Sequence, residues 1–208
     1  MHILLTDRLT CPRCGPEFGL ILLSHRMEER RVLEGSLGCS NCRERFPIHA
    51  GVADLRPPPR GDLTGSKHLE PPTSPSPLEV AALLGVTEGP GNLALLGRMA
   101  AHAEAVAGLV PGVEVVAIAR GLEGEEGETE GVSRFVAGSR LPLQSRSLRG
   151  VALFGDEGLG RAAELVRVVA RFGRVVVWGD VEGWGEALEA EGLKVLVSEN
   201  EALVATRV

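Results

Sequence analysis

Two patterns of hydrophobic residues divide the chain. Up to about residue 57, short apolar stretches between charged and turn residues predict β-strands over residues 19–24, 30–39 and 44–57. From residue 78 onward, continuous valine-rich runs alternate with helical stretches. This alternation is typical of a mostly parallel sheet with helices on both faces. The sequence therefore predicts a small β module followed by a doubly wound α/β module.

The α/β module is predicted to begin with a strand over residues 80–86 and a helix over residues 92–110, with Asn92 as its N-cap. Four more strands are predicted over residues 113–119, 134–138, 150–155 and 174–179, and two more helices over residues 160–173 and 184–192. The last two runs, residues 193–199 and 201–208, are separated only by a short turn, which predicts an antiparallel C-terminal hairpin.

A proline-rich stretch separates the two modules. Residues 56–77 hold seven of the thirteen prolines, with Gly, Ser and Thr between them. Such a composition cannot form a core and favours extended polyproline geometry. The predicted domains are therefore a β module in residues 1–57, a linker in residues 58–77 and an α/β module in residues 78–208.

The four cysteines form two Cys-x-x-Cys pairs, Cys11 with Cys14 and Cys39 with Cys42. Each pair places two thiolates on one tight turn, and two such turns can complete a tetrahedral zinc site. Because four thiolates leave the metal no open position, the predicted Zn²⁺ is structural. Two disulfides, or unrelated buried thiols, are the alternative interpretation.

Composition narrows the functional classes. The net charge of −6 and the pI of about 5.5 argue against binding nucleic acid through bulk positive charge. No segment reaches the roughly 20 apolar residues of a membrane span, and the N-terminus lacks the features of a signal peptide. We therefore expect a cytoplasmic protein whose cysteines are thiols or metal ligands.

Residues 1–57 resemble a known family. The stretch LTCPRCG followed by LGCSNCRERFPIHAGVADLRP is similar to the small zinc ribbons that activate tRNA, rRNA and release-factor methyltransferases, most specifically between Cys39 and Leu55. The resemblance implies a ribbon that holds a methyltransferase domain through strand pairing and apolar contact, without touching the methyl donor itself.

Residues 78–208 resemble the class I S-adenosylmethionine-dependent methyltransferases. The similarity rests on ELVRVVARFGRVVV, on GSRLPLQSRSLRGVALFG and on a parallel sheet that ends in an antiparallel hairpin. The resemblance implies a Rossmann-like methyltransferase fold with S-adenosylmethionine as the possible cofactor.

The acids that bind the cofactor in that family are missing. The first would fall at Gly85, with Thr87 in the first glycine place; the second falls at Ala119 and the third at Ser139. Each lost acceptor costs about 1–3 kcal/mol of binding. Glu88 is the one nearby acid that could compensate. The predicted cofactor-binding positions are Gly85, Thr87, Glu88, Gly89, Gly91, Ala119 and Ser139, as a degenerate site.

The helix expected after the second strand is replaced by residues 121–131, a glycine-punctuated acidic stretch that we expect to be a solvated loop where the adenosine usually rests. No catalytic residue is assigned. These losses predict a non-catalytic scaffold or partner subunit.

Two other functions stay open at this point. One is an active, divergent methyltransferase acting on RNA, protein or a small molecule through Glu88. The other is a domain that binds a different nucleotide, with Arg120 contacting a phosphate. Exposed strand edges could pair with a second copy or with a partner methyltransferase or RNA-associated protein.

Overall fold

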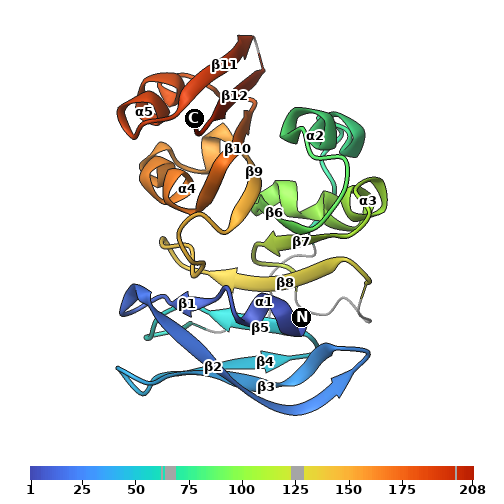
Figure 1. The fold of residues 1–208 in the computed structure, drawn as a ribbon, viewed down its shortest axis with the longest axis vertical. Helices are drawn as coiled ribbons and strands as arrows, with labels where there is room; N and C mark the ends of the chain where they lie inside the picture. Colours follow the sequence, from blue (N-terminus) through green and yellow to red (C-terminus); the bar gives the residue numbers. More distant parts are fainter. Residues whose placement is uncertain (62, 64–68, 123–128, 200) are drawn as a thin grey trace.

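A single sheet runs through the whole molecule (Figure 1). The computed structural model describes residues 1–61, 63, 69–122, 129–199 and 201–208. Within these ranges twelve strands form one sheet in the order β1-β2-β3-β4-β5-β8-β7-β6-β9-β10-β12-β11.

The N-terminal part contributes one short helix and the first five strands. They are α1 (Ile3–Thr6), β1 (Thr10–Cys11), β2 (Gly15–Glu28), β3 (Arg31–Cys39), β4 (Arg45–His49) and β5 (Val52–Leu55). All neighbours among these strands pair antiparallel. In β4, Phe46 and Ile48 are fully buried, whereas Val52 at the start of β5 is half-buried.

The remaining strands form a mixed sheet. They are β6 (Gly91–Leu96), β7 (Val113–Ile118), β8 (Val132–Ala137), β9 (Leu148–Phe154), β10 (Val169–Trp178), β11 (Lys194–Glu199) and β12 (Ala202–Thr206). The neighbours from β8 to β10 pair parallel, while β12 pairs antiparallel with both β10 and β11. The chain thus builds β6, β7 and β8 toward one side and then β9 and β10 toward the other.

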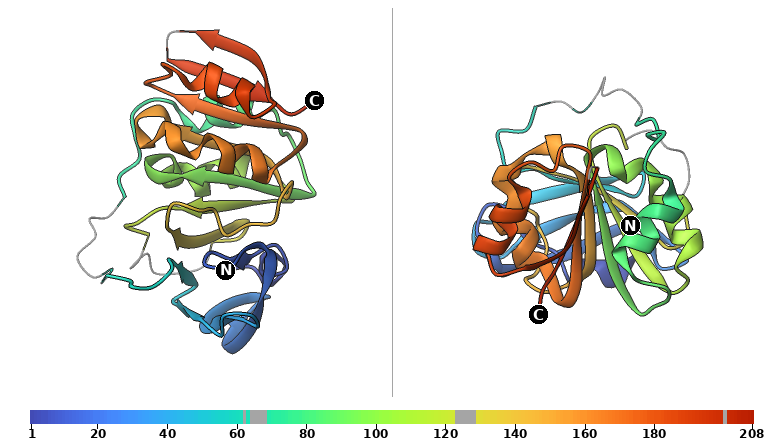
Figure 2. Two further views of the ribbon diagram at one scale, coloured as in Figure 1. Left: turned by 90° about the vertical axis from the view of Figure 1, so that its left-hand side faces the viewer. Right: turned by 90° about the horizontal axis from the view of Figure 1, so that it is seen from above.

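Helices cover both faces of this sheet (Figure 2). One face carries α2 (Pro77–Leu84), the 3-10 helix η1 (Gly97–His102) and α3 (Ala103–Leu109); the other carries α4 (Ala162–Val168) and α5 (Trp184–Ala190). Two further short 3-10 helices, η2 (Gly155–Glu157) and η3 (Leu159–Arg161), follow β9. Alternate residues of β6 serve the two cores, since Leu93 and Leu95 face one and Ala94 and Leu96 the other.

The N-terminal part joins the α/β part at β8. Strand β5 pairs parallel with β8, from Val52 opposite Arg134 to Leu55 opposite Ala137. The core on the α4 and α5 face extends without a break into the N-terminal part and includes Phe46 and Phe135. The two parts therefore share both a sheet and a core.

The start of the α/β part differs from the sequence prediction. Residues 80–86 were expected to form a strand, but residues 80–84 belong to helix α2 and Gly85 is its C-cap. Ser76 caps this helix in a capping box with Glu79, Pro77 occupies the first turn, and Gly85 ends it in the left-handed conformation. These are strong helix boundaries, so capping chemistry outweighs the strand-like apolar run.

The predicted helix over residues 92–110 is also wrong in its first half. Asn92 caps no helix and lies in the central strand β6, which is followed by η1 and α3. Leucine and alanine favour helices locally, but a strand buried on both faces consists of such continuous apolar runs. Tertiary burial therefore decides this segment.

A third difference concerns residues 160–173, predicted as one helix. The helix α4 ends at Val168 and the chain passes directly into β10. Strands do form where they were predicted over residues 113–119, 134–138 and 150–155. Among the described residues, no helix is long and apolar enough to cross a bilayer. The acidic loop was predicted over residues 121–131, of which residues 123–128 lie outside the described ranges.

Candidate functional site

The four cysteines converge at one point. Cys11 ends β1, Cys39 ends β3, and Cys14 and Cys42 lie in the turns that follow. Their four Sγ atoms lie within 4.8 Å of one another, with 3.7 Å between Cys11 and Cys42 and 3.8 Å between Cys14 and Cys39. Sulfurs bound tetrahedrally at about 2.3 Å to one zinc would be about 3.8 Å apart, whereas a disulfide needs about 2 Å. The arrangement thus fits a metal and not two disulfides.

Amide groups of the turns face the sulfurs. The backbone N–H of Cys14 donates to Cys11 Sγ at 3.4 Å, and the side-chain amide of Asn41 donates to Cys14 Sγ at 3.3 Å. Burial opposes ionisation of Cys39, but the N–H groups of Cys42 and Asn41 outweigh it and lower the pKa of this thiol to about 7. Burial raises the pKa of Cys11 to about 12. Cys11 therefore needs a positive partner to ionise.

His49, a fifth potential ligand by its position in the sequence, is exposed at the end of β4. Its Nδ1 lies 3.1 Å from a Glu34 carboxylate oxygen. Among the described residues, the potential metal ligands that gather at this point are the four cysteines, without His49.

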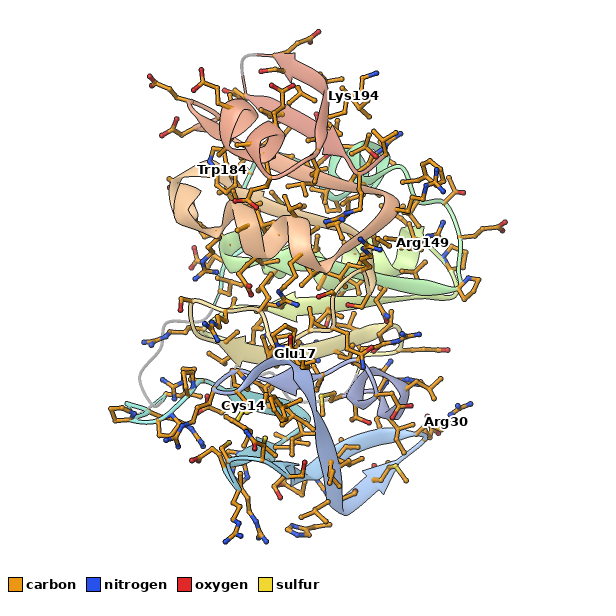
Figure 3. The ribbon with its side chains drawn as sticks, turned by 60° about the vertical axis from the view of Figure 1, so that its left-hand side comes forward. Cys14, Glu17, Arg30, Arg149, Trp184 and Lys194 are labelled. Carbon is orange, nitrogen blue, oxygen red and sulfur yellow. The ribbon has the colours of Figure 1, made fainter. Side chains whose placement is uncertain are left out.

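The cysteine cluster lies at the carboxyl edge of the parallel strands. Strand β5 runs parallel to β8, β4 runs antiparallel to β5, and β3 runs antiparallel to β4. Strand β3 therefore has the direction of β8, and Cys39 at its end faces the same way as the ends of β6 to β10. Figure 3 shows Cys14 and Trp184 on one side of the molecule and Arg30 and Arg149 on the other.

The structure does not bring the predicted cofactor positions together. Gly85 caps α2, and Gly91 begins β6 opposite Val113, the first residue of β7. Thr87, Glu88 and Gly89 lie in the loop between these two points. All five therefore lie at the amino edge, whereas the two remaining positions, Ala119 and Ser139, follow the carboxyl ends of β7 and β8.

The glycine-proline-glycine loop at the amino edge has a packing role. Arg149 donates to the backbone carbonyl of Pro90 at 3.0 Å, and its side chain lies against Gly91. Gly89 approaches the backbone of Gly112 so closely that a Cβ there would collide with it. Close backbone approach therefore requires glycine at position 89, and the φ of 137° favours glycine at position 91. These constraints explain the loop without a bound ligand.

Because β6 and not residues 80–86 is the first strand of the α/β part, the position expected for the first carboxylate changes. That carboxylate would stand two residues before the glycine that follows the strand. Gly97 directly follows β6 with a φ of 56°, and the residue two places earlier is Leu95, fully buried in the core. Ala119 is buried and Ser139 is exposed. Thus none of the three positions offers a carboxylate.

Three charged residues that were not singled out from the sequence lie just beyond the carboxyl ends of β6 and β9. Arg98 donates to both carboxylate oxygens of Asp156, at 2.6 and 2.7 Å, and its backbone N–H donates to Glu157 at 2.8 Å. The Glu157 carboxylate lies directly against Gly97. Burial raises the pKa of Glu157 above its ordinary value, although Arg98 opposes this shift. The guanidinium of Arg98 also stacks on Phe154, 4.3 Å from the ring centroid.

This Arg98–Asp156–Glu157 cluster lies at the topological switch point. Because the chain winds outward in opposite directions from β6 and β9, ligands of doubly wound folds bind outside the carboxyl ends of these two strands. The signal available in the sequence was an Asp-Glu pair directly after an apolar run and an arginine after Gly97. This signal was missed because the residues of β6 were predicted to belong to a helix over residues 92–110.

A large open concavity lies at the opposite edge. It has a volume of about 2410 Å³ and is lined by the β2–β3 hairpin and the starts of β6 and β7, including Arg30, Gly91 and Glu114. Its lining includes neither Ala119 nor Ser139. Arg98, Asp156 and Glu157 do not line it either, so it is distinct from the cluster at the switch point.

No known protein family and no curated protein matches the chain in sequence. Solved structures do match in shape. One is a SAM-dependent methyltransferase from Aquifex aeolicus, with 20% identity, 64% of this chain and 89% of that chain covered, and a TM-score of 0.51. Another is a geranyl diphosphate methyltransferase in complex with GPP and sinefungin, with 12% identity, 64% and 76% covered, and a TM-score of 0.52. The chain has the fold of SAM-dependent methyltransferases.

Proposed function

We propose that this protein is a zinc-binding, non-catalytic member of the methyltransferase fold that serves as a scaffold or partner subunit. The observation that carries the proposal is the Glu157 carboxylate, which lies on Gly97 and accepts the Arg98 N–H at the switch point. An internal carboxylate thus takes the place over the first loop that a ligand would need.

The lack of free carboxylates around this position also opposes cofactor binding. The ribose hydroxyls and adenine amino group of S-adenosylmethionine need acceptors, and Leu95, Ala119 and Ser139 supply no carboxylate. Each missing acceptor removes about 1–3 kcal/mol. Asp156 is already bound by Arg98 through two hydrogen bonds. Glu88 cannot compensate, since it lies at the amino edge of the sheet.

The metal in this proposal is Zn²⁺ held by Cys11, Cys14, Cys39 and Cys42. The sulfur spacing and the donated N–H groups support it. Four thiolates would give a closed shell, whose role is to stabilise the fold and not to activate water. Without a metal, several thiolates at one point would repel one another, so the charged form of the cluster depends on the ion.

The N-terminal ribbon is proposed to act within its own chain. Strand β5 occupies the edge of β8 that a separate ribbon would need. A partner methyltransferase, an RNA-associated protein or a second copy must therefore bind another surface. One such surface is the outermost strand β11, on which Leu196 and Val197 are exposed.

An active methyltransferase is the competing function, and isothermal titration calorimetry separates the two. We expect no saturable heat when S-adenosylmethionine or S-adenosylhomocysteine is titrated into the zinc-loaded protein. Micromolar affinity for either would overturn the proposal. A Glu157→Ala variant, titrated in parallel, tests whether the Glu157 carboxylate itself blocks binding at the switch point. Binding gained by the variant supports this role. If neither protein binds, the missing acceptors are sufficient to explain the loss.

A further inference from the structure

The segment that follows β8 is held directly by the residues next to the cysteine cluster. The Thr10 N–H donates to the Pro142 carbonyl at 3.0 Å, and the Gln144 N–H donates to the Arg8 carbonyl at 2.8 Å. Between these bonds, Leu9 and Leu143 form an antiparallel bridge and both are fully buried. Residues 141–144 therefore behave as a short additional strand alongside residues 8–10.

The other side of this segment is held by α4. Arg167 donates to the carbonyls of Leu141 and Leu143, at 2.7 and 2.6 Å. The carboxylate of Glu164 accepts the N–H of Leu141 at 2.8 Å and also pairs with Arg167. These bonds hold the backbone of the segment from two sides. Its position therefore depends on residues 8–10 on one side and on α4 on the other.

The neighbour on the ribbon side has little support of its own. Strand β1 is two residues long, Thr10 and Cys11, and its pairing with β2 is irregular. An isolated pair of this length is not stable in water. Beyond this pairing, this short stretch is held by the Leu20 N–H, which donates to the Leu9 carbonyl at 3.3 Å, and by the burial of its side chains. Cys11 adds a further tie, since its sulfur lies 3.7 Å from that of Cys42. A metal bound by these sulfurs would pin β1 to the turns after β1 and β3.

We propose that metal occupancy of the four-cysteine cluster controls the docking of residues 141–144, so that a segment at the carboxyl edge of the sheet responds to zinc. This rests on the metal binding proposed above. The physical basis is that metal binding and the ordering of its ligands are one equilibrium. A segment bonded to Thr10, beside a ligand, shares that equilibrium, whereas β6 and β7 are held by their own pairing.

Hydrogen exchange measured by mass spectrometry on the full chain tests this directly. Zinc content is measured first: protein that neither contains nor takes up Zn²⁺ refutes the metal site itself. If zinc binds, its removal by a chelator should speed exchange in peptides covering residues 8–14 and 141–148 by at least about tenfold. Peptides covering β6 and β7 should be unchanged. Unchanged exchange at 141–148, or equal loss of protection across the sheet, would overturn the inference.

A second experiment works on the zinc-loaded protein and needs no stable metal-free form. Binding equilibria that are coupled are coupled in both directions, so loosening the segment should weaken zinc. The Arg167→Gln variant removes the guanidinium that holds Leu141 and Leu143 and touches no cysteine. We expect zinc affinity, measured by competition with a chromogenic chelator, to fall several-fold. The same substitution at exposed Arg171, which stacks on Phe172, should leave it unchanged. Equal affinities in the two variants would contradict the coupling.

Discussion

Arg31 and Glu114 form a two-bond ion pair that links the N-terminal part of the chain to the α/β part. The Arg31 guanidinium donates to both carboxylate oxygens of Glu114, at 2.9 and 3.2 Å. Only 8% of the Arg31 side chain and 14% of the Glu114 side chain are exposed. Ser133 donates to the same carboxylate at 2.5 Å. This pair fastens the amino edge, at the opposite end of the strands from the cysteines.

Removing one member of this pair should be costly. An uncompensated buried charge typically costs about 3–5 kcal/mol, so we expect Arg31→Met to lower the free energy of unfolding by that order in urea titrations. The control is Arg26→Met, which breaks an exposed pair with Glu28 at 3.8 Å and should cost less than about 1 kcal/mol. Similar effects of the two variants would show that Arg31 does not fasten the two parts.

Loss of a zinc ligand should destabilise the protein. In Cys39→Ser the hard hydroxyl replaces a thiolate, so the purified protein should hold less zinc. If about 3 kcal/mol is lost, Tm should fall by roughly 6–12 °C for a chain of this size. Ser40→Ala, an exposed position beside Cys39, is the control and should retain both zinc and Tm. A full zinc content in Cys39→Ser would contradict the four-sulfur site.

The pH dependence of stability should report on Glu157. Because burial raises its pKa in the folded state, the folded protein holds this proton at pH values where the unfolded chain has lost it. Stability from this group is therefore present below the ordinary glutamate pKa of about 4.3 and is lost as pH rises through the raised value. We expect the stability of the wild type relative to Glu157→Gln to fall between about pH 4 and neutrality. A constant difference across that range would mean that Glu157 has an ordinary pKa.

Gly97 should tolerate no side chain while Glu157 is present. A Cβ there would collide with the Glu157 carboxylate, and the φ of 56° is left-handed. The backbone conformation alone costs a non-glycine residue about 1–2 kcal/mol. Gly97→Ala should therefore unfold earlier in urea than Gly160→Ala, where a Cβ meets open space.

The double variant Gly97→Ala/Glu157→Ala separates the two causes of this destabilisation. Relief of the collision should return part of the lost stability, leaving the backbone cost. Strict additivity of the two substitutions would show that Glu157 does not lie against Gly97 in solution.

The sequence predicted the layers of the fold better than its first elements. The valine-rich strands were identified because continuous runs of β-branched residues favour buried strands. The spacing of the two cysteine pairs correctly predicted that the four thiols gather at one point. The elements on either side of residue 90 were predicted wrongly, with helix and strand exchanged. Both are runs rich in leucine and alanine, and such runs suit either structure. Ser76 and Pro77 marked the first as a helix, but the second became a strand only through burial between two layers of helices.

The same error displaced the predicted site. With residues 80–86 taken as the first strand, the candidate loop was assigned to Gly85–Gly91, which lies at the amino edge of the sheet. Ala119 and Ser139 follow the carboxyl ends of β7 and β8, because these two strands form where they were predicted. The Arg98–Glu157 contact joins two loops 59 residues apart, and no local pattern encodes such a pairing.

The pairing of β5 with β8 has a consequence for how the protein behaves in a cell. Two separate chains joined along such an edge come apart on dilution, so their assembly varies with how much of each is synthesised. Here a covalent tether makes the association intramolecular, and the effective local concentration of the N-terminal part is set by the connecting segment alone. The edge of β8 is therefore shielded equally at low and high expression, in every copy of the protein.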